Sequence, residues 1–171
     1  MTFAIQKLIW QVEGIRDTFH RAVYTDHDVD AAIAAAGPDC TVEHAPMGTG
    51  AGPEHLRAFL ADDVVPHLPA GLAFQRITRT SDQRRLVEEN LVSFTHDRPL
   101  PWLLPGIPAT GRAVEVRAVT FVAFKHTSHL GDISTRILSY RVLWDLYSML
   151  SQLDVEPMLH RPPARAPSGR S

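Results

Sequence analysis

The chain has 171 residues, of which 44% are hydrophobic, and a formal net charge of −2 at pH 7. This length and composition are typical of one domain with a sizeable core. The nearly balanced charge excludes a strong positive field that would attract nucleic acids or anionic membranes. The single cysteine, Cys40, cannot form an internal disulfide, and no basic segment leads into a cleavage site near the N-terminus. We therefore expect a cytoplasmic protein without nucleic-acid or membrane partners.

Two helices are predicted first along the chain. Apolar residues recur at helical spacing from Ile5 to Val23, which predicts a long amphipathic helix. Asp28 then precedes an alanine-rich run over 29–36, which predicts a short second helix that Gly37 and Pro38 end.

A strand, a loop and a third helix are predicted next. Apolar and polar residues alternate from Cys40 to His44, which predicts a strand, and the glycine-rich segment 46–52 predicts a loop. Pro53 suits the first turn of a third helix, whose apolar stripe ends at Val64.

The second half of the chain is rich in β-branched and aromatic residues and predicts paired strands. Four strands are expected over 72–81, 85–96, 113–126 and 133–143. The segment 97–112 holds four prolines and suits a rim or lid, and a short helix is expected over 146–153. Helices followed by an antiparallel meander predict an α+β domain over 1–156, with a disordered, proline-rich and arginine-rich tail over 157–171.

Several segments of this chain resemble SnoaL-like proteins of the NTF2-like superfamily, which are often described as polyketide or ester cyclases. The resemblance is carried by VEENLVSFTHDRPLPWLLPGIPATGR over 87–112, by Trp144-Asp145 with the helix that follows, and by Glu43-His44-Ala45-Pro46. It implies an NTF2-like (cystatin-like) cone, in which a strongly curved antiparallel sheet wraps the long first helix around a pocket. It also implies dimerisation through the outer face of the sheet.

The resemblance implies cofactor-independent ring closure or isomerisation, but the last strand departs from the family. Where the family pattern reads approximately His-Glu-His-Ile-Tyr-Trp-Asp-Gln, this chain keeps only Trp144-Asp145. The substrate class therefore does not carry over, and fold alone does not determine function.

Asp145 matches the position at which the family's cyclases use a carboxylate as a proton shuttle. A carboxylate held against Trp144 in a dry pocket would have a raised pKa and could exchange protons near neutral pH. The alternative is a helix N-cap, because Asp145 immediately precedes the last helical stripe. A contact with Arg141 would lower its pKa and argue against proton donation.

His96 is the second catalytic candidate, because it ends a strand at the edge of the proline-rich segment and titrates near neutral pH. Strand alternation places it on the same face as Val92 and Phe94. The alternative is a histidine that hydrogen-bonds the loop backbone and has no chemical role.

The remaining candidates would line the pocket rather than react. Each also has a structural alternative, an ion pair for the charged residues and a core position for the aromatic ones. They are Tyr24, His44, Glu89, Trp102, Arg141 and Trp144.

No metal site or cofactor-binding motif is predicted. His126 and His129 are spaced by three in a strand-to-turn segment, and no cysteine or carboxylate set completes a site. The leading hypothesis is therefore a cofactor-independent lyase or isomerase that acts on a hydrophobic, carbonyl-containing small molecule, such as an intermediate of secondary metabolism. The alternatives are a non-catalytic ligand-binding or dimerisation module, and a hydrolase or hydratase that activates water with a pocket carboxylate such as Glu89.

Overall fold

A computed structural model of the chain describes residues 2–45, 49–129 and 132–155. The expected tail over 157–171 lies outside the described residues. The helices are α1 (Thr2–Arg21), α2 (Val29–Ala35), α3 (Gly52–Ala58) and α4 (Leu146–Leu153), and the strands are β1 (Ala36–Ala45), β2 (Thr49–Ala51), β3 (Ala73–Ser81), β4 (Arg85–Thr95), β5 (Ala113–His129) and β6 (Asp132–Trp144). No helix within the described part of the chain is long and apolar enough to cross a membrane.

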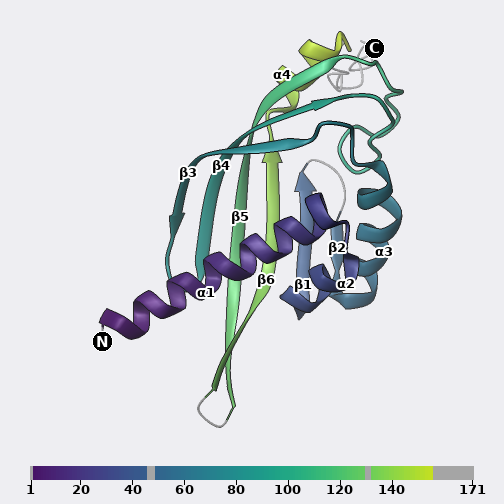
Figure 1. Cartoon of the computed structure of the whole chain (residues 1–171). Helices are drawn as coiled ribbons and strands as arrows, with labels where there is room; N and C mark the ends of the chain where they lie inside the picture. The colour runs from purple at the N-terminus through teal and green to yellow at the C-terminus, as the bar shows by residue number, and fades with distance from the viewer. Residues whose placement is uncertain (1, 46–48, 130–131, 156–171) are drawn as a thin grey trace, which may run out of the picture.

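The strands form one strongly bent sheet in the order β2-β1-β6-β5-β4-β3, and α1 crosses its concave side (Figure 1). Strands β3 to β6 are an antiparallel meander, as predicted, whereas β1 pairs with β6 in parallel. The sheet is therefore mixed, and the expectation of a wholly antiparallel sheet is corrected. The parallel pair arises because the chain crosses from β1 through α3 to the far edge at β3 and returns beside β1 only at β6.

Most expected elements are present, with shifts at their ends. The predicted loop over 46–52 contains the short strand β2, which pairs with β1. Two of the predicted helices end in wider π-helical turns, Ala22–Asp26 after α1 and Phe59–Val64 after α3. Such turns change which side chains face the sheet, and they are frequent near functional sites.

Alternation along the strands separates an inner, buried face from an outer face. In β4 the residues at even positions from Leu86 to Phe94 are buried, and those at odd positions are partly exposed. Two of the inner residues, Glu88 and Asn90, are polar although they are 1% and 2% exposed. Polar groups buried on a core face require partners, so these two positions direct attention to the concave side.

Candidate functional site

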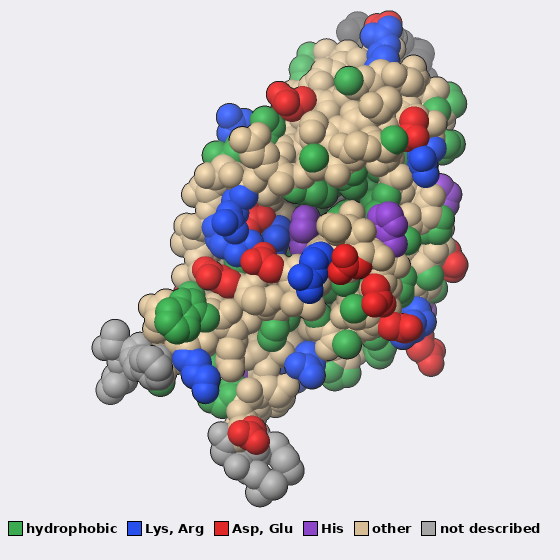
Figure 2. All heavy atoms as spheres, in the orientation of Figure 1, with side chains coloured by type: hydrophobic (Ala, Val, Ile, Leu, Met, Phe, Trp, Pro, Cys, Tyr) green, Lys and Arg blue, Asp and Glu red, His purple; other side chains and the backbone are tan. Residues whose placement is uncertain are grey.

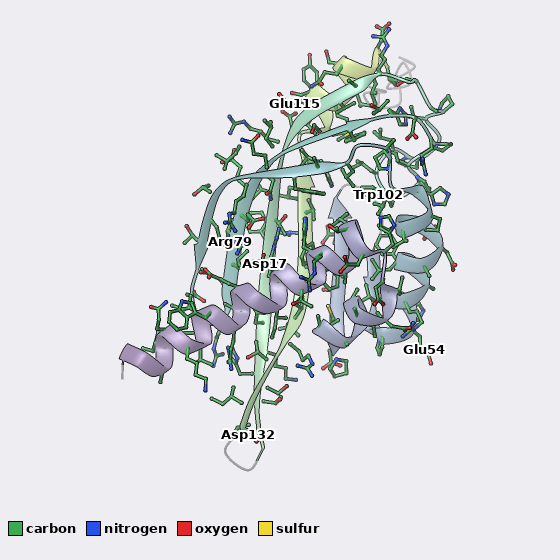
Figure 3. All side chains as sticks on the ribbon, in the orientation of Figure 1. Asp17, Glu54, Arg79, Trp102, Glu115 and Asp132 are labelled. Carbon is green, nitrogen blue, oxygen red and sulfur yellow. The ribbon has the colours of Figure 1, made fainter. Side chains whose placement is uncertain are left out.

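The concave side of the sheet opens between α1 and β3. Figure 2 shows a hollow on this face, with a histidine side chain in it and basic and acidic side chains along its rim. Figure 3, in the same orientation, places Arg79 and Asp17 at that rim. We take this hollow and the side chains that enclose it as the candidate site.

Three rings from three elements meet around His20, near the end of α1. The His20 ring lies 4.8 Å from Tyr24 and 4.6 Å from Phe74 of β3, measured between ring centroids. Its Nδ1 atom is 3.4 Å from the Tyr140 hydroxyl of β6. Tyr24 lies in the π-helical turn that continues α1, so one continuous helical segment supplies both His20 and Tyr24. The cluster presents a mostly apolar wall with an imidazole and phenols as its polar groups.

His20 is neutral across the physiological pH range. Burial lowers its pKa to about 3, with a further contribution from the positive charge of Arg16. Burial also raises the pKa of Tyr24 and that of Tyr140, so both phenols keep their protons. The cluster therefore offers a neutral imidazole, which can donate at one ring nitrogen and accept at the other, beside phenolic hydrogen-bond donors.

A buried ion network adjoins the ring cluster. Glu88 of β4 accepts hydrogen bonds from Arg16 of α1, from Arg79 Nε at 2.5 Å and from Asn90 Nδ2 at 2.9 Å. Arg79 also bonds Asp17 at 2.6 Å. Burial acts to raise the pKa of Asp17, but the hydrogen bond and charge of Arg79 outweigh burial and lower it. The network joins α1, β3 and β4 at one end of the hollow.

The sequence contains a signal for these residues that the prediction did not use. Arg16, His20 and Tyr24 are spaced by four on one face of the first helix, within its apolar stripe. Glu88 likewise interrupts the apolar face of its strand. A polar residue repeated on a buried face is a reason to search for a partner, although the sequence does not identify that partner.

Asp145 lies where the N-cap alternative placed it. It precedes α4, and its carboxylate accepts hydrogen bonds from the Ser148 backbone N–H at 3.0 Å and from the Ser148 hydroxyl at 2.6 Å. These bonds lower the pKa of Asp145, whereas the proton-shuttle hypothesis expected it to be raised. The side chain is exposed, so the dry environment expected for a proton shuttle is absent at this position.

The cap predicts a specific mutational result. Asp145→Ala is expected to lower the free energy of unfolding by roughly 0.5–2 kcal/mol, because it removes the acceptor for the first turn of α4. Asp145→Asn keeps an acceptor oxygen and is expected to cost little. Urea unfolding of the two variants measures this difference. Equal losses in both variants would show that the carboxylate charge, and not the cap, is what matters.

His96 shares a face with Val92 and Phe94, as strand alternation predicted, and all three are buried. Its Nδ1 atom is 3.2 Å from the Thr110 hydroxyl, and its backbone bonds residues 110–112. Burial lowers the pKa of His96. These contacts match the loop-anchoring alternative, and they hold both ends of the proline-rich segment together.

Three of the expected pocket residues are interior. Tyr24 and Trp144 both neighbour Phe74, at centroid distances of 4.9 and 6.5 Å, and Trp102 lies 6.0 Å from Trp144. The aromatic wall therefore extends from His20 to the buried segment that follows β4. The burial of these rings matches the core position that was the alternative for them, and their contact with a ligand stays a prediction. The histidine at their centre was not predicted.

Two charged candidates lie on the outer face and are corrected as residues of the pocket on the concave side. Glu89 forms an ion pair with Arg117, which is the structural alternative stated for it. Arg141 stacks over the Phe121 ring at 5.3 Å, whereas the Asp145 carboxylate bonds Ser148. Both point away from the concave side because they occupy outward positions in their strands. The backbone of His44 belongs to β1, and its side chain lies outside the described part of the structure.

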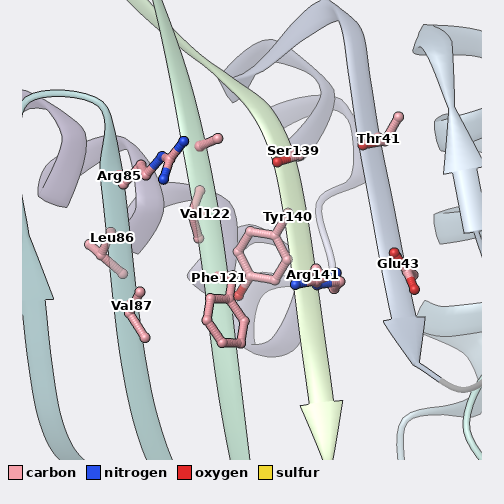
Figure 4. A pocket seen from close by; sticks show the side chains of 11 residues that line it. Thr41, Glu43, Arg85, Leu86, Val87, Phe121, Val122, Ser139, Tyr140 and Arg141 are labelled. Carbon is pink, nitrogen blue, oxygen red and sulfur yellow. The ribbon is translucent and has the colours of Figure 1, made fainter.

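The outer face carries a shallow groove of about 390 Å³ across β4, β5, β6 and β1. Figure 4 shows Arg85, Phe121 and Arg141 among its lining residues. Within 2–45, 49–129 and 132–155, no group of three or more histidine, cysteine or acidic residues is placed to hold a metal ion.

No known family profile and no curated protein sequence matches this chain. Several solved structures do match this chain. A protein from Jannaschia sp. described as a SnoaL-like polyketide cyclase is 18% identical, with 84% of this chain and 93% of that chain covered and a TM-score of 0.57. An NTF2-like protein of unknown function from Burkholderia pseudomallei is also 18% identical, with 82% and 95% covered and a TM-score of 0.58.

A third structure is TerC co-crystallised with polyporic acid, which is 15% identical, with 82% of this chain and 96% of that chain covered and a TM-score of 0.55. Identities this low establish the fold alone. The expected NTF2-like cone is confirmed, and SnoaL-like proteins are among the structures that share it.

Proposed function

We propose that this chain binds a largely apolar, carbonyl-containing small molecule in the hollow over His20 and catalyses cofactor-independent proton transfer on it, as an isomerase or lyase. One observation carries the proposal, the neutral His20 held 3.4 Å from the Tyr140 hydroxyl within a wall of aromatic rings. The shared fold of structures described as polyketide cyclases supports the same class of chemistry.

The chemistry follows from the groups around His20. In the tautomer with hydrogen on Nδ1, that N–H donates to the Tyr140 oxygen, and Nε2 is left as the proton acceptor. Nε2 takes a proton from the carbon next to a ligand carbonyl, and the C–H electrons form an enolate. The enolate either takes the proton back at another carbon or attacks an internal carbonyl, and His20 then protonates the new alkoxide.

Arg16 makes this transfer easier than the low pKa of His20 alone suggests. Its charge disfavours an imidazolium in the empty site, but it stabilises the negative enolate oxygen as that charge develops. The enolate in turn stabilises the imidazolium beside it. The proton transfer therefore produces an imidazolium and an enolate side by side, and each charge stabilises the other.

Ligand binding without turnover is the second candidate function. It is favoured by the pairing of both carboxylates near the hollow, Asp17 and Glu88, with arginines. The hydrolase or hydratase alternative needs a pocket carboxylate, and Glu89, the residue considered for it, lies on the outer face.

Calorimetric binding and product analysis with one panel of compounds separate these functions. The panel contains β-polyketones, lactones and polyporic acid, the compound present in the TerC crystals. Binding with turnover in the presence of a chelator supports the proposal. Binding without turnover of any member supports the second candidate, and no binding at all contradicts both.

We also infer that two copies of the chain pair through the outer face of the sheet. Apolar side chains are partly exposed there, among them Val87 at 38% and Leu143 at 39%. Light scattering at micromolar concentration is expected to give twice the monomer mass of 19.0 kDa, and Leu143→Arg is expected to shift the particle toward one copy. A parent protein that scatters as a monomer would contradict the inference.

A further inference from the structure

The hollow has one aromatic end and one cationic end. Phe74 and Arg76 are two residues apart on β3, and their partners in β4 are Val92 and Asn90, which are both buried. Opposite residues of an antiparallel pair share a face, so Phe74 and Arg76 both lie on the inner side. Along a strand, two residues span about 7 Å. An aromatic ring and a guanidinium are therefore neighbouring side chains on the inner face of β3.

Arg76 is the arginine of this end that remains largely in solvent. Glu88 accepts its hydrogen bonds from Arg16, Arg79 and Asn90, and the Arg76 Nη1 atom stays 3.9 Å from the Glu88 carboxylate. The Arg76 side chain is 55% exposed, and it makes no hydrogen bond to another side chain of the described segments. Its fork of N–H donors is available to a carboxylate, which guanidinium groups bind well.

The charges of the network leave a positive excess at Arg76. Arg16 and Arg79 pair with Asp17 and Glu88, and Arg76 adds a third cation to these two anions. A carboxylate that binds Arg76 would therefore meet a net positive charge among these five residues.

We propose that the ligand of this hollow is an organic acid, whose apolar body lies against Phe74 and whose carboxylate binds Arg76. The inference relies on the proposed function for the location of the ligand, and it adds the substrate class. Because Phe74 and Arg76 are neighbours on one face of β3, the ligand would carry its acid group at one end of an aromatic body. Arg76 would be a specificity residue, because it distinguishes an acid from a neutral compound of the same shape.

The experiment compares two probes of equal shape, para-phenylbenzoate and para-phenylbenzamide, by calorimetry with the full chain at low salt. The acid is expected to bind about fivefold more tightly, the range of a half-exposed ion pair. Arg76→Gln is expected to abolish that preference and leave the affinity for the amide unchanged. Asp17→Asn removes a rim carboxylate and is expected to widen the preference. Arg141→Gln is the matched control, because Arg141 lies beside an aromatic ring on the opposite face.

The outcomes are distinguishable from those of the proposed function. Equal affinities for acid and amide, an acid preference that survives Arg76→Gln, or no binding of either probe would each overturn the organic-acid proposal. A preference lost in Arg76→Gln and kept in Arg141→Gln supports it, even if no compound is turned over. If the acid preference is found but no compound is turned over, the proton-transfer proposal fails and the organic-acid proposal is still supported.

Discussion

Replacing Glu88 with glutamine is expected to lower the free energy of unfolding by about 3–5 kcal/mol. The Glu88 side chain is 2% exposed and accepts from two guanidinium groups, one of which belongs to Arg16, itself 5% exposed. Glutamine has nearly the same shape but no charge, and it presents an amide NH₂ group where one carboxylate oxygen stood. The variant therefore leaves buried positive charge without compensation, which costs far more than the loss of an exposed pair.

Glu89→Gln is the matched control, because it changes the next residue of the same strand in the same way. Glu89 is on the outer face, and its partner Arg117 is 62% exposed, so the expected loss is about 0–1 kcal/mol. Urea unfolding followed by tryptophan fluorescence measures both variants. Similar losses for the two would show that the inner network contributes no more than a surface ion pair, and that the packing of α1 against the sheet rests on apolar contacts.

The course of the chain was largely predictable because strands and helices have local periodicities. Alternation along the strand predicted that His96, Val92 and Phe94 share a face, and the proline and glycine positions predicted most element ends. The parallel pairing of β1 with β6 was not predictable in this way. It depends on where the chain returns after α3, a long-range property with no local signal.

The candidate site was predicted only in part, for a related reason. Asp145 has the same local sequence whether it caps a helix or faces a pocket, and only the tertiary structure shows that Ser148 occupies its oxygens. His20 was not selected, because its partner Tyr140 lies 120 positions later in the chain. The aromatic candidates are buried, as their structural alternative stated, since large rings are usually buried wherever they occur.

Replacing His20 with glutamine is expected to lower kcat/KM for a confirmed substrate by about 100-fold or more, the usual contribution of a positioned general base. Glutamine can still hydrogen-bond Tyr140, but it cannot take a proton. The parent enzyme should also have an unusual pH profile. An ordinary histidine base loses activity below its pKa near 6.5, whereas the pKa of His20 is about 3 in the folded protein. Activity should therefore stay level from pH 8 to about pH 5 and fall only in stronger acid.

Stability provides a readout for the same residue that needs no substrate. Because burial lowers the pKa of His20, the unfolded chain binds the proton more readily between about pH 3 and the ordinary histidine value. His20 therefore lowers the free energy of unfolding as the pH falls through that window, and His20→Gln should make the free energy of unfolding depend less on pH there.

Asp145→Asn serves as the control for activity and should keep the parent rate and pH profile, because the Asp145 carboxylate already bonds Ser148. Loss of turnover in Asp145→Asn, with parental turnover in His20→Gln, would return the proton shuttle to Asp145 and remove His20 from the chemistry.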